Sequence, residues 1–163
     1  MSSDNNDFDR GESGASLTEL AEAGRMKPGS LIMMKETFPC KVTAFSTAKP
    51  GKHGSAKAMI TAKDIFTDKQ YDETFGTGDM IPRPLVSKAE MTVIAYEDDG
   101  VLQIMTQEGE MKEDLNLPTE SHLSDITSKI KQIVDAADKE CLIQVQRWGD
   151  KEQVVGVREG QDQ

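Results

Sequence analysis

Short apolar runs separated by turn residues are the feature of this sequence that most constrains its fold. Between about Lys27 and Phe75 the runs are "SLIMMK", "CKVTAFS", "AKAMITAKDIF" and "YDETF", with glycine, proline and aspartate between them. Runs of this length and punctuation predict short antiparallel strands. In the second run, alternation predicts that Val42, Ala44 and Ser46 share one face of a strand. The region is about sixty residues long, which suits a small SH3-like barrel.

The second half of the chain changes from strands to a helix and back to strands. Residues 91–96 and 101–106 flank the turn sequence "EDDG", and Asp-Gly between apolar runs is a good hairpin signal. Five apolar residues then recur at helical spacing: Leu123, Ile126, Ile130, Ile133 and Val134. Two final runs, "CLIQVQRW" and "QVVGVRE", follow this helix as strands. Three strands, a helix and two strands is the order of an OB-fold barrel.

Two composition changes divide the chain. Residues 1–25 are rich in Asp, Asn, Ser, Gly and Glu, which predicts a disordered acidic tail. "MIPRPLVSK", residues 80–88, holds two prolines and predicts an extended connector or an edge strand. We therefore expect a mainly β chain with three parts: a tail over 1–25, an SH3-like barrel over 26–86 and an OB-fold domain over 87–163.

Charge is unevenly distributed among these parts. The 163 residues carry a formal net charge of −10, yet residues 26–88 have a net charge of +4 and residues 89–163 a net charge of −10. The basic half is suited to a polyanion, and the acidic half resists non-specific adhesion to one. The sequence shows no membrane-spanning run and no signal peptide, so we expect a cytoplasmic protein. Cys40 and Cys141 are then expected to be buried, reduced thiols.

The usual catalytic and metal-binding patterns are absent from the sequence. His53 and His122 are the two histidines, and no Cys-x-x-Cys or His-x-x-x-His spacing occurs, which argues against a zinc site. "PGKHG" lacks the glycine and the Ser or Thr of a P-loop, and no Gly-x-Ser-x-Gly occurs. An enzyme that uses the carboxylates of the second half is an alternative, but no nucleophile, base and orienting group can be assembled. We expect no enzyme.

One purely cationic loop, "KPGKHGSAK", lies between two expected strands. Pro50 presets a backbone angle, and Gly51 and Gly54 permit positive φ values, so Lys52 is expected at the tip of a hairpin. Lys49, His53 and Lys57 would surround Lys52 with positive potential. A solvated surface turn is one interpretation, and a flexible cationic group that reaches a phosphate backbone is the other. A generic RNA-binding module or chaperone with several equivalent lysines is a further alternative.

The loop and its surroundings resemble the eukaryotic translation initiation factor 5A family. "KPGKHGSAK" followed by "KDIFTDKQYDE" looks like the family's hypusine signature, and "SLIMMKETFPCKV" and "YEDDGVLQIMTQEGEMKEDLNLP" extend the match. The resemblance runs from about Met26 to about Val157. It implies an SH3-like barrel joined to an OB barrel, in agreement with the pattern of the elements.

The resemblance also implies a site and partners. Lys52 matches the lysine that is converted to hypusine, with Gly51, His53 and Gly54 as turn neighbours and Lys49 and Lys57 as flanking contacts to RNA. Deoxyhypusine synthase would add an aminobutyl group from spermidine, and deoxyhypusine hydroxylase would add a hydroxyl. The modified chain would need no separate cofactor. It would bind the large ribosomal subunit near the exit site and position peptidyl-tRNA, promoting elongation through proline runs and assisting termination.

The loop departs from the family pattern at two positions. Pro50 stands where the family usually has Thr, and Ser55 stands where it usually has His. Pro50 stiffens the turn, and Ser55 removes an imidazole that could contact RNA or the modifying enzymes. Neither change alters Lys52. We expect them to affect the efficiency of modification, above all the hydroxylation step.

Overall fold

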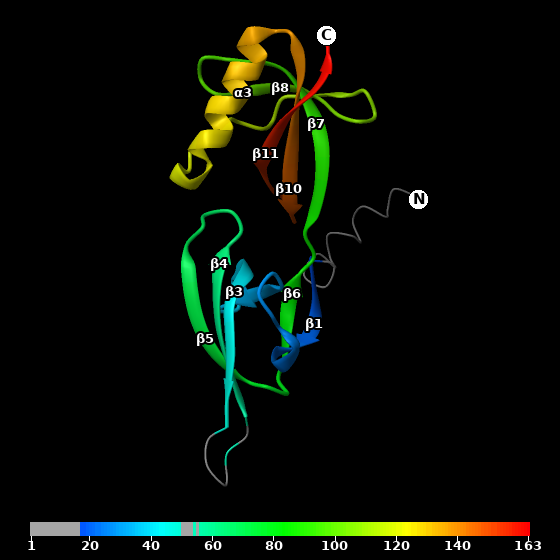
Figure 1. Cartoon of the computed structure of the whole chain (residues 1–163). Coiled ribbons are helices and arrows are strands. Elements are labelled where there is room, and N and C mark those ends of the chain that lie inside the picture. Colours follow the sequence, from blue (N-terminus) through cyan, green and yellow to red (C-terminus); the bar gives the residue numbers. More distant parts are fainter. Residues whose placement is uncertain (1–16, 50–53, 55) are drawn as a thin grey trace, which may run out of the picture. The chain divides into compact units, whose positions relative to one another are not determined.

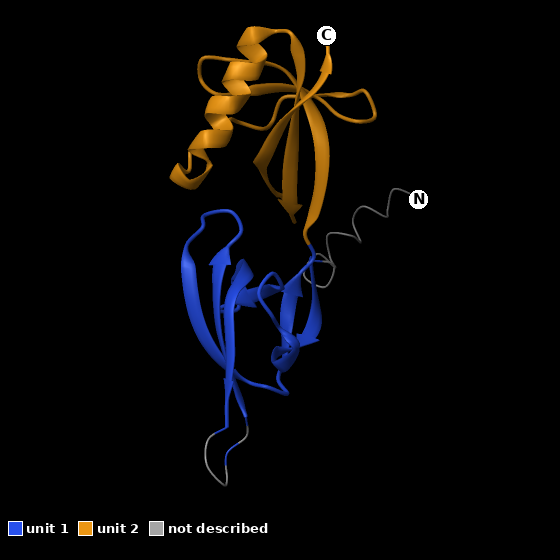
Figure 2. Cartoon of the chain, in the orientation of Figure 1, with its two compact units in different colours: residues 1–85 blue, residues 86–163 orange. Residues whose placement is uncertain are grey.

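The computed structural model describes residues 17–49, 54 and 56–163 of the chain. These residues belong to two compact units, residues 1–85 and residues 86–163, which are coloured separately in Figure 2. The division falls one residue before the predicted end of the first barrel. No helix in the described part of the chain is long and apolar enough to span a membrane.

Unit 1 is built from antiparallel strands. Its four-stranded sheet has the order β2-β3-β4-β5, formed by Leu31–Met34, Phe38–Ala48, Lys57–Asp64 and Gln70–Gly76. These are the four strands predicted from the short apolar runs. Between β4 and β5 the Asp64 carboxylate accepts hydrogen bonds from the N–H groups of Phe66 (2.8 Å) and Thr67 (3.0 Å). Asp64 is therefore a buried side chain whose charge is satisfied by the turn.

A β-bulge in β3 changes which side chains face the core. The pairing of β3 with β4 shifts register between Val42 and Ala44, which leaves Thr43 as the extra residue. Because one extra residue reverses the alternation, Ala44 and Ser46 are exposed and Phe45 packs against the core. The prediction that Val42, Ala44 and Ser46 share one face is therefore wrong, because Val42 is buried whereas Ala44 and Ser46 are exposed.

The largest correction to the sequence prediction concerns residues 17–25. β1 (Thr18–Glu22) and the 3₁₀ turn η1 (Ala23–Arg25) lie within the predicted tail, and β1 pairs with β6 (Met80–Pro84) in a two-stranded sheet. Ala23 is 0% exposed in the core of unit 1. The two prolines of β6 are tolerated because β6 has a strand on one side only. The remainder of the predicted tail, residues 1–16, lies outside the described residues.

Unit 2 has the element order predicted for an OB fold. Its five-stranded sheet has the order β11-β10-β7-β8-β9, formed by Lys151–Asp162, Lys139–Trp148, Ser87–Tyr96, Leu102–Met105 and Met111–Lys112. The predicted "EDDG" turn joins β7 to β8, where Gly100 has a φ of +94° and donates its N–H to the carbonyl of Glu97 at 2.9 Å. Glycine suits this position because L side chains rarely adopt that φ.

The helix of unit 2 follows a short 3₁₀ turn, η2 (Ser121–Leu123). Helix α3 (Ser124–Ala136) buries Ile130 and Ile133, and Ile126 and Val134 pack partly against the same core. The predicted apolar stripe is confirmed for these four residues, whereas Leu123 lies in η2, where it is also buried. The residue after the helix, Ala137, caps it: Ala137 adopts a left-handed conformation and donates its N–H to the carbonyl of Ile133.

The two cysteines are buried and unpaired with each other, as expected. Burial and the nearby Asp64 carboxylate raise the pKa of the Cys40 thiol to about 12. Burial raises the pKa of the Cys141 thiol to about 11. Both side chains therefore remain protonated at neutral pH and act as small apolar residues of the two cores.

We predict that β1 and η1 contribute to the stability of unit 1. A chain lacking residues 1–25 loses the β1–β6 pairing and buried Ala23, and its free energy of unfolding should fall by more than about 2 kcal/mol. A chain lacking only residues 1–16 should differ from the full chain by less than about 0.5 kcal/mol. Urea denaturation followed by circular dichroism measures both, and equal effects of the two truncations would contradict the assignment.

Candidate functional site

The candidate site is the connection between β3 and β4. These strands pair continuously from Cys40 opposite Asp64 to Ala48 opposite Lys57, apart from the bulge. Figure 1 shows the two strands running side by side towards the connection, residues 49–56. An antiparallel hairpin fixes the distance between the two ends of its loop, because the last pair of opposed residues sets the separation of their Cα atoms.

The predicted site residues fall into two groups. Lys49, Gly54 and Lys57 are described and exposed, at or beside the ends of the connection. Gly51, Lys52 and His53 lie outside the described residues, as do Pro50 and Ser55. The structure thus brings Lys49 and Lys57 to the end of the same hairpin. Lys57 belongs to the terminal pair Ala48–Lys57, and Lys49 is the residue after Ala48.

Backbone hydrogen bonds hold the β4 side of the connection. The carbonyl of Ala56 accepts the N–H of Thr77 at 3.1 Å, and the next residue, Lys57, lies opposite Gly76 of β5. The carbonyl of Thr77 in turn accepts the N–H of Gly24 at 2.8 Å. The end of the connection is therefore tied to the β5–β6 turn, and that turn is tied to η1.

The β5–β6 turn is itself closed by hydrogen bonds. The Asp79 carboxylate accepts the N–H of Gly76 at 2.8 Å, and the N–H of Asp79 donates to the carbonyl of Gly76 at 3.0 Å. The carbonyl of Asp79 accepts the N–H of buried Ala23 at 2.9 Å. Two hydrogen bonds thus join this turn to η1. Each segment at the base of the candidate site has its backbone partners within unit 1.

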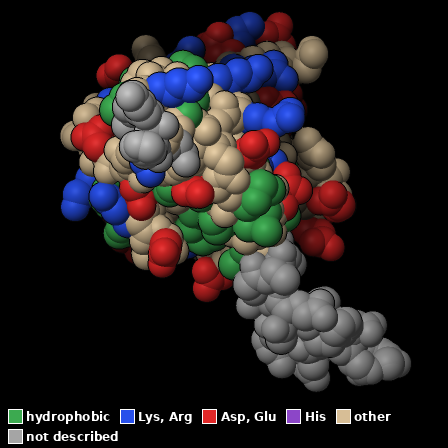
Figure 3. Space-filling model, turned by 90° about the horizontal axis from the view of Figure 1, so that it is seen from below, with side chains coloured by type: hydrophobic (Ala, Val, Ile, Leu, Met, Phe, Trp, Pro, Cys, Tyr) green, Lys and Arg blue, Asp and Glu red, His purple; other side chains and the backbone are tan. Residues whose placement is uncertain are grey.

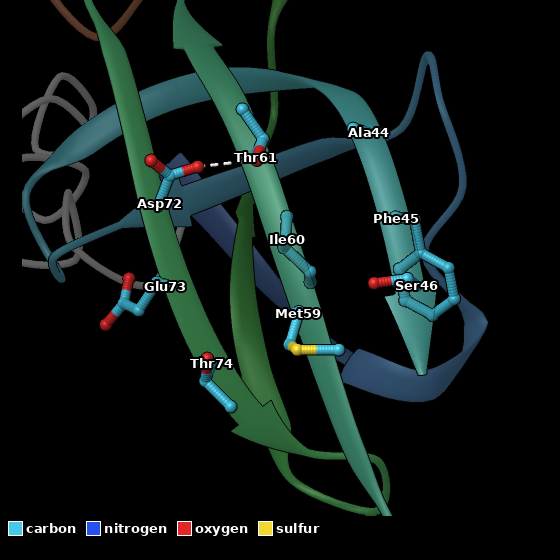
Figure 4. A pocket seen from close by; sticks show the side chains of 9 residues that line it. All are labelled: Ala44, Phe45, Ser46, Met59, Ile60, Thr61, Asp72, Glu73 and Thr74. Carbon is cyan, nitrogen blue, oxygen red and sulfur yellow. Dashed lines mark hydrogen bonds between the residues drawn. The ribbon is translucent and has the colours of Figure 1, made fainter. Parts of the chain in front are cut away.

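A shallow cavity of about 310 Å³ lies on the outer face of the same sheet. Figure 4 shows its lining from β3, β4 and β5, with Met59 between Ser46 and Thr74, its neighbours on the adjacent strands. The Thr61 hydroxyl donates to the Asp72 carboxylate at 2.5 Å, and the Glu73 carboxylate accepts the N–H of Lys35 at 2.8 Å. Both carboxylates of the cavity therefore have structural partners.

Positive charge near the connection is local. Lys41 and Lys63 lie opposite each other at the other end of the hairpin. The rise of a strand places the Cα atom of Lys41 about 25 Å from that of Lys49. Figure 3, in which the chain is seen from below, has acidic and basic side chains interspersed on that face. The described surface around the site is therefore mixed in charge, and Lys49 and Lys57 are the described lysines at the connection itself.

Metal binding has no support in the part of the chain that the structure describes. No group of three or more His, Cys, Asp or Glu side chains there is placed to hold a metal ion. What the described geometry offers is a firmly held hairpin that ends in a cationic segment.

Comparisons with known proteins match both units. A family model described as "Translation initiation factor 5A-like, N-terminal" matches residues 16–78, and one described as "Eukaryotic elongation factor 5A hypusine, DNA-binding OB fold" matches residues 85–158. The eukaryotic translation initiation factor 5A of Dictyostelium discoideum is 40% identical over 152 residues, covering 93% of this chain and 91% of the relative. The chain belongs to the eukaryotic translation initiation factor 5A family.

Other members of the initiation factor 5A family agree in sequence and fold. Eukaryotic translation initiation factor 5A-2 of Arabidopsis thaliana is 35% identical, covering 98% of this chain and 97% of the relative. A solved structure of an initiation factor 5A family protein from Naegleria fowleri has a TM-score of 0.78 at 35% identity, covering 87% of this chain and 99% of that one. The predicted family and the predicted SH3-like and OB-fold domains are confirmed.

The hydrogen bonds beneath the candidate site were not predictable from the family motif. Gly24, Ala56 and Thr77 lie far apart in the sequence and interact through backbone atoms, so their side chains carry no signature of the contact. Gly24 is the position where a side chain matters. A Cβ atom there would lie 2.8 Å from the Thr77 carbonyl oxygen, which is too close for an unstrained contact.

We predict that Gly24→Ala loosens the base of the candidate site. The new methyl group would push Thr77 away, which should cost about 1–3 kcal/mol of unfolding free energy and speed hydrogen exchange of the Thr77 amide. Gly78→Ala is the matched control, because a Cβ atom at Gly78 meets nothing within 4 Å. Denaturation and amide exchange by NMR measure both variants. Equal behaviour of the two would show that Gly24 has no special role.

Proposed function

We propose that this chain is a translation factor whose Lys52 is converted to hypusine and acts on the ribosome. The observation that carries the proposal is the position of the lysine-containing motif at the end of the β3–β4 hairpin, in a chain of the initiation factor 5A family. Lys49 and Lys57 lie at the two ends of the motif and are exposed. They supply the positive potential that an RNA partner requires.

The modification suits a loop of this kind. Deoxyhypusine synthase transfers an aminobutyl group from spermidine to the Lys52 amine, and deoxyhypusine hydroxylase adds a hydroxyl. The product is a longer side chain with two amines and one hydroxyl, whereas unmodified lysine has one amine and a shorter reach. The chain itself needs no further cofactor under this proposal. Gly54 is exposed and the carbonyl of Ala56 is held by the N–H of Thr77. Under this proposal the modifying enzymes reach the motif from its solvent-exposed side.

The proposed action is orientation of a substrate held by the ribosome. The protein binds the large subunit near the exit site, in the cytoplasm, and hypusine contacts the acceptor end of peptidyl-tRNA. Limiting the motion of that end lowers the entropic part of the barrier to peptidyl transfer. The effect is largest at sequences such as proline runs, where the acceptor end is otherwise poorly positioned. Release at termination would be assisted in the same way. Ribosomal RNA performs the chemistry, so the protein is an effector and no enzyme.

A firm support is needed for such an effector, and the described base of the site is consistent with it. The bonds from Ala56 to Thr77 and from Thr77 to Gly24 join the end of the motif to the core of unit 1. A side chain carried on a firmly held base loses less entropy when it orients a partner than one carried on a mobile base. The generic RNA-binding alternative requires several equivalent lysines, whereas Lys41 and Lys63 lie at the far end of the hairpin.

We predict that Lys52→Arg abolishes function while Lys57→Arg preserves it. Arginine keeps the positive charge, but its guanidinium cannot accept the aminobutyl group in place of the lysine amine. Cells that depend on Lys52→Arg should stall at proline runs as cells without the protein do. Ribosome profiling and growth measure the effect, with Lys57→Arg as the exposed matched control beside the same loop.

Two results would contradict the proposal. If Lys52→Arg supports normal growth and normal translation of proline runs, hypusine at this position has no role. If alanine at Lys41, Lys49, Lys52, Lys57 and Lys63 reduces RNA affinity to a similar extent, with a steep dependence on salt, the generic RNA-binding alternative is favoured.

A further inference from the structure

A row of three apolar side chains and one threonine crosses the outer face of unit 2. The register places Leu142 of β10 opposite Thr92 of β7, Thr92 opposite Met105 of β8, and Met105 opposite Met111 of β9. Residues directly opposite each other in antiparallel strands lie on the same face of the sheet. We call this row, together with Ile94 at the neighbouring bulge of β7, the methionine face.

The methionine face is open to solvent where the adjacent positions are not. Met111 is 53% exposed, Ile94 49% and Met105 38%. Their neighbours along β7 and β8, Val93 and Ile104, are 3% and 0% exposed because they point into the core. Single exposed apolar residues are ordinary, but a contiguous group on adjacent strands is typical of a surface that binds a partner.

Acidic residues surround the methionine face. Residues 87–116, which form β7, β8, β9 and the loops between them, hold eight acids and two bases, Lys88 and Lys112. Glu97, Asp98 and Asp99 lie in the β7–β8 loop, and Glu108 and Glu110 lie in the β8–β9 turn, all of them exposed. The field of so many like charges attracts a cationic partner and speeds its association.

Two of the cations near this face, Lys112 and Arg158, are neutralised by partners. Lys112 lies opposite buried Ile104, and its amine is 2.9 Å from the Asp114 carboxylate and 3.0 Å from that of Glu152. Arg158, at the β11 end of the row, makes two hydrogen bonds to the Glu90 carboxylate. These bonds lower the pKa of Glu90, so the pair stays ionised and contributes no net positive charge.

This combination does not suit a nucleic acid. OB folds that bind oligonucleotides use the face of their second and third strands, here β8 and β9, and the loop between the first two strands, here residues 97–101. Binding there depends on aromatic side chains for stacking and on cations for the phosphates. Methionines occupy that face in this chain, and three consecutive acids occupy that loop.

Charge also argues against two occupants that this chain could itself supply, its own N-terminal residues and a second copy of the same face. Residues 1–16 hold four acids and one base, so they would be repelled by an acidic surface. A second copy of the same face would bring acids against acids in a symmetric dimer. A partner with basic and apolar residues meets neither objection.

We propose that the methionine face binds a cationic amphipathic segment of a partner protein. The apolar side of the segment packs on Met105, Met111 and Ile94, and its Lys or Arg side chains reach the acids of the two loops. Methionine side chains adapt to irregular apolar surfaces, which suits such a segment. Unit 2 therefore serves protein recognition, whereas the proposed RNA contacts belong to unit 1.

The test uses the full chain with methyl-labelled methionine in NMR titrations. The probes are an amphipathic peptide of leucine and lysine, a peptide of equal length with glutamate in place of lysine, and an oligouridylate. We expect the Met105 and Met111 methyl signals to shift with the lysine peptide and to stay unchanged with the other two. Met80, an exposed methionine of unit 1, is the internal control.

Matched variants separate the apolar contribution from charge. Met105→Gln with Met111→Gln keeps the charges and the size of both side chains, and it should weaken binding of the lysine peptide at least about tenfold. Met80→Gln should leave that affinity unchanged. The proposal is overturned if oligouridylate shifts the Met105 and Met111 signals, if the lysine peptide shifts Met80 equally, or if the double variant binds as the unchanged chain does.

Discussion

The pairing of β3 with β4 is the constraint on which the proposed site depends. The hairpin runs from the buried Cys40–Asp64 pair, within the core of unit 1, to the Ala48–Lys57 pair at the start of the cationic motif. One end is held by packing and the other is exposed. The hydrogen bonds from Ala56 to Thr77 and from Thr77 to Gly24 extend this support to the end of the motif.

Much of the fold was predictable because it rests on local patterns. The apolar stripe of α3, the Asp-Gly turn before β8 and the short runs of β2 to β5 each carry a signal within a few residues. β1 was missed because its apolar residues, Leu20 and Ala21, form only a short pair between two acids, and because the prolines of its partner β6 suggested a connector or an edge strand. The bulge at Thr43 left no signal either, since it depends on how β3 pairs with β4.

The candidate site was predictable in a different way. Lys52 and its neighbours were found from one specific motif, and the family assignment by comparison agrees with that resemblance. The support of the motif could not be found by the same means, because Gly24, Ala56 and Thr77 meet through backbone atoms. The methionine face was not predictable from the sequence for a related reason. Its members are ordinary residues of separate strands, and they form a row only through the register of four strands.

The opposite net charges of residues 26–88 and residues 89–163 indicate a division of roles. Residues 26–88 carry a net positive charge and include the motif proposed to contact RNA, whereas residues 89–163 are strongly acidic. A uniformly basic chain would adhere to RNA at many places. Confining the net positive charge to one stretch of the chain restricts non-specific contacts, while the acidic unit 2 remains available to protein partners of opposite charge.

The central claim is that Lys52 carries hypusine, and a peptide mass spectrum across Lys52 tests it most directly. The sample is protein purified from its native cell. The account predicts a mass increase that matches an added aminobutyl group with a hydroxyl; the aminobutyl increment alone would indicate that the hydroxylation step fails on this loop. An unmodified Lys52 in an active native sample would contradict the account.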